Sequence, residues 1–179
     1  MNLSSRIVTN IFTHKQVHLA EPVDNEIEVF EKSILVTETN LEGIIVYTNR
    51  RYESLSGFSE MELLGSPHCI VRHPDMPKGV FKAMWKIIQS GKIWRGYIKH
   101  LCKDGSFFWT LTYIQVKVDK QNNIIGYTSS AKVAYGDARD EVEKQYKKYY
   151  DDKHINRRYF MASENYQEEY VAEYARLHE

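Results

Sequence analysis

Three long strand-like segments in the second half of the chain constrain the fold most strongly. They cover residues 93–101, 106–118 and 124–133, and short polar turns join them at residues 103–105 and 119–123. The first turn contains Asp104-Gly105, and an Asp-Gly pair between two such segments is a strong hairpin signal. These residues are therefore predicted to form three consecutive antiparallel strands.

A second hairpin and several short helices are predicted upstream of these strands. Residues 33–37 and 44–47 have strand-like patterns around the turn residues 40–43. One helix begins after Asn49 and stops at Gly57, and a second stops at Gly65. A third reaches Gly91 and has large apolar residues at the i, i+3, i+4, i+7 spacing, namely Phe81, Met84, Trp85 and Ile88. This order predicts an α+β domain, with short helices on one face of a five-stranded antiparallel sheet and a ligand between the two layers.

The length of 179 residues favours one core domain with extensions. We expect an N-terminal arm over residues 1–30, the domain over 31–135 and a helical extension over 136–179. Ile7, Val8, Ile11 and Phe12 have helical spacing, which predicts a short helix in the arm. The extension has two tyrosine-rich stripes, Val142, Tyr146, Tyr149 and Tyr150, then Tyr166, Tyr170, Tyr174 and Leu177. Tyrosine stripes of this kind are typical of packing against the same domain or a second subunit, so a homodimer or partner docking is expected.

Composition excludes several classes of protein. Lys+Arg and Asp+Glu both number 24, so no basic field favours nucleic acid. The longest aliphatic run is residues 44–46, which is too short for a membrane span, and the N-terminus has no apolar signal region. The two cysteines, Cys69 and Cys102, form no CxxC pair. We therefore expect a cytoplasmic protein with reduced thiols.

The segment of residues 71–77, Val-Arg-His-Pro-Asp-Met-Pro, is the strongest candidate for ligand binding. Arg72 offers a planar fork of donors that suits phosphate or carboxylate, and His73 can donate or accept a hydrogen bond. Asp75 is placed to cap the following helix, while the two prolines restrict the loop. The pattern predicts an anion-binding turn, although a plain loop before a capped helix has the same residues.

The motifs taken together resemble a PAS domain. Those that carry the resemblance are Leu55–Phe58, Met61–Gly65, Lys103–Ser106 and the order of elements. Residues 67–70, the 71–77 turn, Phe81, Met84-Trp85 and Trp94 are similar, more narrowly, to the FAD-binding PAS module of bacterial aerotaxis receptors and related energy-taxis sensors. The likeness extends over about residues 35–147.

This resemblance implies a sensor of redox state or electron transport that holds FAD and does not act as an enzyme. In that family the signal passes to a methyl-accepting signalling domain. Neither that domain, a HAMP linker nor a membrane segment fits in this chain. We therefore expect the PAS-only half of a bipartite energy-taxis system, whose partner is a membrane-bound chemoreceptor.

The resemblance also implies roles for individual residues. Arg72, His73 and Asp75 match positions needed for FAD binding, with Arg72 placed to pair with the pyrophosphate. Asn49 matches a position implicated in cofactor binding, although a helix N-cap role explains it equally well. His68 also matches the family, but a histidine near a turn is more often a structural hydrogen bonder.

Aromatic residues and one histidine complete the predicted FAD site. Phe81 and Trp85 lie one helical turn apart and either form a wall for the isoalloxazine ring or fill the core. Strand alternation places Trp94 and His100 on the inward face, with Trp94 as a stacking candidate. The aerotaxis receptor has asparagine where this chain has His100, so the contacts to the polar edge of the ring are expected to differ.

Other sensor types were weighed against the FAD interpretation. A light-sensing LOV domain places a reactive cysteine near Cys69, but the stretch Asn-Cys-Arg-Phe is absent. A haem sensor would use His68, His73 or His100, yet the long helix has no histidine. Zinc at His68, Cys69 and His73 lacks a fourth ligand. A cofactor-free PAS dimerisation or docking module is the remaining alternative. No catalytic triad, carboxylate pair or phosphate loop indicates an enzyme.

Overall fold

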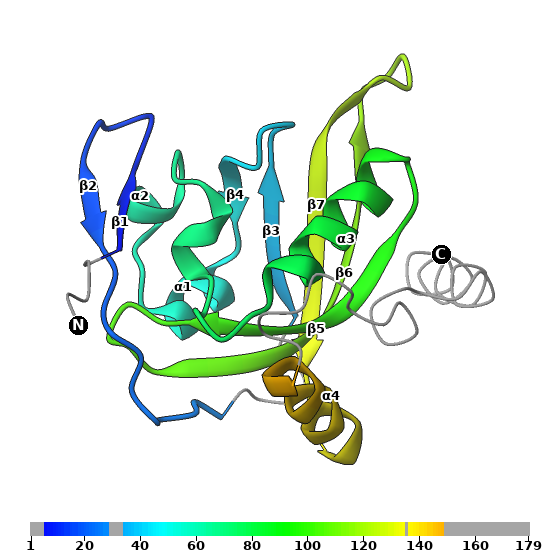
Figure 1. Cartoon of the computed structure of the whole chain (residues 1–179). Helices are drawn as coiled ribbons and strands as arrows, with labels where there is room; N and C mark the ends of the chain where they lie inside the picture. The colour runs from blue at the N-terminus through cyan, green and yellow to red at the C-terminus, as the bar shows by residue number, and fades with distance from the viewer. Residues whose placement is uncertain (1–5, 29–33, 135, 149–179) are drawn as a thin grey trace.

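The computed structural model describes residues 6–28, 34–134 and 136–148. Its centre is an antiparallel five-stranded sheet with the strand order β4-β3-β7-β6-β5 (Figure 1). The strands are β3 (Leu35–Thr39), β4 (Ile45–Thr48), β5 (Trp94–Leu101), β6 (Phe107–Val118) and β7 (Ile124–Val133). The predicted α+β fold with a five-stranded antiparallel sheet is confirmed. Strand β3 begins at Leu35, two residues after the start of the predicted strand over residues 33–37.

Four short helical elements connect β4 to β5. They are α1 (Arg50–Ser56), α2 (Glu60–Leu63), the 3-10 helix η1 (His68–Val71) and α3 (Lys78–Gln89), and α3 lies in front of β7 and β6 in Figure 1. Asn49 caps α1, because its side chain accepts a hydrogen bond from the Tyr52 amide at 3.0 Å. Gly57 ends the same helix with φ of 73°, a left-handed conformation that favours glycine.

The β5–β6 hairpin forms as the Asp-Gly pair predicts. Asp104 accepts a hydrogen bond from the Ser106 amide at 3.0 Å, and Gly105 has φ of 91°. A Cβ atom at Gly105 would collide with the carbonyl oxygen of Glu21. The hairpin therefore requires glycine for its backbone conformation and for the segment that passes over it.

The N-terminal arm is a β-hairpin, so the prediction of a helix there is wrong. Strands β1 (Ile7–Thr9) and β2 (Gln16–His18) pair with each other, and the side chain of Asn10 accepts hydrogen bonds from two amides in the turn between them. The same side chain donates to the Leu64 carbonyl at 2.7 Å. The arm is thus fixed by a contact more than fifty residues away in sequence, which local spacing cannot reveal.

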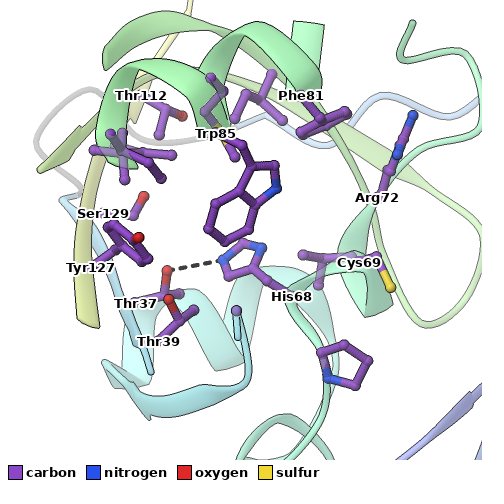
Figure 2. A pocket seen from close by; sticks show the side chains of 18 of the residues that line it. Thr37, Thr39, His68, Cys69, Arg72, Phe81, Trp85, Thr112, Tyr127 and Ser129 are labelled. Carbon is purple, nitrogen blue, oxygen red and sulfur yellow. Dashed lines mark hydrogen bonds between the residues drawn. The ribbon is translucent and has the colours of Figure 1, made fainter. Parts of the chain in front are cut away.

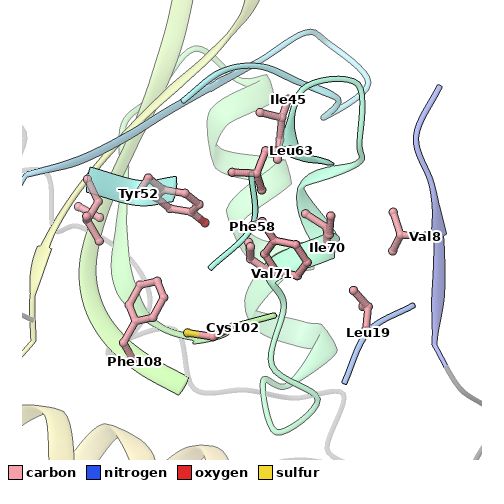
Figure 3. Packing of buried hydrophobic residues seen from close by; sticks show 12 residues of the cluster. Val8, Leu19, Ile45, Tyr52, Phe58, Leu63, Ile70, Val71, Cys102 and Phe108 are labelled. Atoms are coloured by element: carbon pink, nitrogen blue, oxygen red, sulfur yellow. The ribbon is translucent and has the colours of Figure 1, made fainter. Parts of the chain in front are cut away.

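The hairpin closes one of two apolar clusters. Figure 3 shows Val8 and Leu19 of the arm facing Ile70 and Phe58 of the helical layer, and all four are at most 7% exposed. Burial of such side chains contributes about 1.5–3 kcal/mol each relative to exposure. This cluster fixes η1, which carries His68 and leads into the 71–77 turn.

Helix α4 (Gly136–Lys148) packs on the opposite face of the sheet from α1 and α3. The Tyr146 hydroxyl donates to the Tyr97 carbonyl at 2.8 Å, and its ring stacks on Trp109 with centroids 6.0 Å apart. Val142 is buried beside it, whereas Tyr149 and Tyr150 of the first tyrosine-rich stripe lie outside the described residues. The second stripe, and the predicted domain boundaries at residues 30 and 135, lie outside the described residues. Within the described part of the chain, no helix has the length and apolar character needed to cross a membrane.

Candidate functional site

A cavity of about 270 Å³ lies between the inner face of the sheet and the layer formed by η1 and α3. The sheet contributes four hydroxyl side chains, Thr37, Thr39, Thr112 and Ser129 (Figure 2). The helical layer contributes mainly apolar side chains, Phe81, Met84, Trp85 and Ile88. The sheet wall is therefore mixed, with these hydroxyl groups beside the apolar side chains of Ile98, Ile114 and Ala131. The helical wall is mainly apolar and aromatic, and such a combination is typical of sites for organic ligands.

Trp85 forms the centre of the apolar wall. Its indole meets Tyr127 edge to face, with centroids 5.4 Å apart and planes at 82°. A Cβ atom on Gly43 would lie only 3.1 Å from the indole, so glycine at this turn leaves room for the ring. A flat aromatic ligand in the cavity would therefore contact two aromatic side chains from opposite layers.

Arg72 lines the cavity beside Phe81 (Figure 2). Its guanidinium carbon lies 4.2 Å from the centroid of the Phe81 ring, and one terminal nitrogen donates to the Met76 carbonyl at 3.1 Å. These contacts orient a planar cation at the edge of the site. The geometry suits an anionic group that enters from the rim.

Two histidines line the cavity, His68 from η1 and His100 from β5. His68 shares a hydrogen bond with the Thr37 hydroxyl at 3.0 Å, and burial lowers the pKa of His68 to about 4. His100 shares one with Thr110 at 3.0 Å, and burial together with the neighbouring His68 lowers the pKa of His100 to about 3. Both imidazoles are therefore neutral at pH near 7 and add hydrogen-bonding groups without charge.

The cavity wall contains buried polar atoms that have no hydrogen-bond partner among the described residues. They are the hydroxyl of Tyr52 and Nδ1 of His100, and the two residues are 2% and 4% exposed. Their rings meet edge to face with centroids 6.1 Å apart. Buried polar atoms without partners are costly, so this pair indicates that the cavity normally contains a group that hydrogen-bonds them.

Five of the nine predicted cofactor-binding residues line this cavity: His68, Arg72, Phe81, Trp85 and His100. The other four, Asn49, His73, Asp75 and Trp94, do not. Asn49 is engaged as the α1 N-cap and also donates to the Ile34 carbonyl at 2.9 Å. Trp94 is fully buried and its indole lies over Gly96, where any Cβ atom would collide with it.

His73 and Asp75 organise the turn behind Arg72. Nδ1 of His73 accepts a hydrogen bond from the Asp75 amide at 3.2 Å, and burial, with the nearby Lys99, lowers the pKa of His73 to about 4. Asp75 does not cap α3, contrary to the prediction, because Pro77 occupies the N-cap position. The Asp75 carboxylate instead pairs with the Lys99 ammonium at 3.0 Å.

Several lining residues were missed by the sequence argument, including Tyr52, Tyr127 and the four hydroxyl residues of the sheet. Strand alternation could have found part of this set. Thr37 and Thr39 alternate on β3, and Thr112 pairs with Gly96 on the inward face of β5.

The two cysteines differ in environment. Cys69 is exposed at the cavity, whereas Cys102 is buried and its pKa is raised by burial to about 11.

Comparison with known proteins finds two similarities in sequence. Residues 45–131 match the family described as the PAS fold. The aerotaxis receptor of Escherichia coli strain K12 is 34% identical over 117 residues, which cover 65% of this chain and 23% of the receptor. Residues 45–131 are therefore similar to a PAS fold, and the chain is similar to the aerotaxis receptor over 117 residues. It spans less than a quarter of the length of that receptor.

Solved PAS-fold structures agree with this assignment at the level of the fold. The light state of the blue-light photoreceptor Aureochrome1 LOV superposes with a TM-score of 0.55 at 21% identity, over 64% of this chain and 91% of that chain. An RNA-binding light-oxygen-voltage receptor superposes with a TM-score of 0.52 at 18% identity, over 65% of this chain and 33% of that chain. The cavity thus lies between the sheet and helices of a PAS domain.

Proposed function

We propose that this PAS domain binds FAD in the cavity and serves as a redox sensor for energy taxis. The observation that carries the proposal is the presence in one cavity of two aromatic side chains, Trp85 and Tyr127, and of unpartnered polar atoms on Tyr52 and His100. A flavin ring is flat, apolar on its faces and polar along one edge, so it complements both walls. The similarity to the aerotaxis receptor supports the same ligand class.

Different residues of the cavity would bind different parts of FAD. Trp85 and Tyr127 would contact the flavin ring system, and Arg72 would meet the negative diphosphate at the rim. The neutral His100 would hydrogen-bond the polar edge through Nδ1, since its Nε2 is engaged with Thr110. A bound flavin supplies reversible electron transfer. In this proposal the domain reports redox state and does not act as an enzyme.

The output of the sensor would pass through α4 to a membrane-bound methyl-accepting chemoreceptor with a HAMP and signalling domain. Lys99 supports this direction, because its ammonium lies 3.0 Å from Asp75 in the turn and 4.0 Å from Glu143 on α4. It thus connects the turn that positions Arg72 with the helix on the outer face. The domain itself would be cytoplasmic and docked to its receptor.

The absorption spectrum of the purified full chain tests the cofactor assignment. We expect the bands of an oxidised flavin, and chromatography of the heat-released ligand should identify FAD rather than FMN. A Soret band would indicate haem, and a colourless protein that binds no added flavin would indicate a docking module; either result contradicts the proposal. Bleaching by blue light with recovery in the dark would favour a LOV photoreceptor that uses Cys69.

A substitution at the rim tests the site. Arg72→Ala should give folded protein with at least about tenfold weaker FAD binding, because a charge-assisted pair with the diphosphate is lost. Arg50→Ala, which removes an exposed arginine of α1, is the matched control and should retain full occupancy. Equal occupancy in both variants would show that Arg72 is not part of the site.

A further inference from the structure

Helix α3 carries an uncompensated positive stripe. Lys78, Lys82 and Lys86 are spaced four residues apart, and all three side chains are exposed. The helix contains no acidic residue. Within the described part of the chain none of the three lysines forms an ion pair. This face of α3 therefore has no internal counter-charge.

The stripe is unfavourable for the helix alone. Like charges at i, i+4 repel one another on a helix surface. Lys78 is also the first residue of α3, next to the positive end of the helix dipole, and no side chain caps this end. An anion bound along the stripe would relieve both effects. A solvated surface would normally interleave acidic residues, as α4 does with Asp140, Glu141 and Glu143.

The stripe borders the rim of the cavity. Residues three apart on a helix are neighbours, so Lys78 lies next to Phe81 and Lys82 lies next to Trp85. Phe81 and Trp85 are half-buried lining residues, and Phe81 also supports the Arg72 guanidinium. Arg72 lines the cavity, and Lys78 and Lys82 lie beside its lining residues on α3, so three positive charges lie on this side of the site. The acidic lining residue Glu42 lies in the turn between β3 and β4.

The size of the cavity determines what reaches these charges. At about 270 Å³ it is near the lower limit of ligand pockets, which hold about 300–1,000 Å³. It suits a ring system and not a whole dinucleotide. We infer that the diphosphate of the flavin lies outside the cavity along α3, held by Lys78 and Lys82 together with Arg72, so the domain selects FAD over flavins without a phosphate tail. This inference rests on the proposed function.

Titration of the full-length, flavin-free chain with riboflavin, FMN and FAD tests the inference. We expect FAD to bind at least about tenfold more tightly than riboflavin, with FMN between them. Lys82→Ala and Lys78→Ala should each weaken FAD binding by roughly threefold to fivefold, the size of an exposed charge contact, and the double variant by more. Riboflavin binding should stay within about twofold in every variant, because riboflavin has no phosphate.

Two matched variants sharpen the test. Lys120→Ala removes an exposed lysine in the β6–β7 turn and should leave all three flavins unaffected. Lys82→Arg retains the charge and should restore most of the FAD affinity. Added salt should weaken FAD binding more in the wild type than in the double variant, because surface charge contacts are screened.

The outcomes separate the inference from the proposed function. If no flavin binds, the proposed function fails. If the three flavins bind equally tightly, or the lysine variants weaken riboflavin as much as FAD, the domain is a flavin sensor whose selectivity does not come from α3, and the inference is overturned.

Discussion

Replacement of Tyr146 by phenylalanine should release α4 from the sheet without unfolding the domain. The Tyr146 hydroxyl donates to the Tyr97 carbonyl at 2.8 Å, and Tyr97 belongs to β5, the edge strand of the sheet. The aromatic contact with Trp109 is retained by phenylalanine. The change therefore isolates one hydrogen bond between the helix and the sheet.

The expected effect is local and moderate. A hydrogen bond between neutral groups contributes about 0.5–1.5 kcal/mol, and this one is only partly buried, so about 1 kcal/mol is expected. That corresponds to a roughly fivefold increase in the population with α4 undocked. Tyr47→Phe, at an exposed tyrosine of β4, is the control.

Amide hydrogen exchange measured on a peptide covering residues 136–148 is the assay. Exchange in this peptide should accelerate roughly fivefold in Tyr146→Phe, while peptides from β3 and β7 should be unchanged. Unchanged exchange in residues 136–148 would show that this bond does not hold α4. An equal acceleration in β3 and β7 would show that the helix unfolds only with the whole domain.

Two further substitutions test the buried groups and the hairpin. His100 has its pKa lowered from 6.5 to about 3, so the unfolded chain binds its proton at higher pH than the folded chain and the wild type should lose stability as pH falls below about 6.5. When the pH is lowered from about 7 to about 4.5, the free energy of unfolding measured by urea denaturation should fall by about 2 kcal/mol less in His100→Asn than in the wild type. Equal decreases in the two proteins would contradict a buried neutral histidine. Gly105→Ala should lower the free energy of unfolding by at least about 1 kcal/mol, because φ is 91° and the new methyl group meets the Glu21 carbonyl. Thermal melting against Ser54→Ala, at an exposed residue of α1, measures this effect, and equal melting temperatures would refute it.

The elements that the sequence predicts well are those whose signals are local. Asn49 and Gly57 mark the ends of α1, and Asp104-Gly105 marks the β5–β6 turn, because capping and turn chemistry act over a few residues. The N-terminal hairpin could not be predicted in this way. Its turn depends on Asn10, whose side chain also bonds the distant Leu64 carbonyl.

The candidate site was predicted in part for a similar reason. Alternation correctly places Trp94 on the inward face of β5, but Gly96 leaves space for the indole to lie along the strand, outside the cavity lining. Asp75 has the residue type of an N-cap, but Pro77 occupies that position and the Lys99 ammonium on a distant strand pairs with Asp75. The positions and partners of these two side chains depend on which distant residues the fold brings together.

Strand β5 provides a short physical connection between the cavity and α4. His100 and Ile98 on its inner face line the cavity, whereas Lys99 and Tyr97, one residue away, contact α4 through the Lys99 ammonium and the Tyr97 carbonyl. Successive residues of a strand point to opposite faces, so a backbone shift that accommodates a group at His100 also moves the partners of α4. Lys99 also pairs with Asp75, so a shift of the turn behind Arg72 would move the same lysine that contacts α4. Reduction of a bound flavin should therefore change exchange in residues 136–148 in the wild type, and Lys99→Met should reduce that change while flavin occupancy is retained.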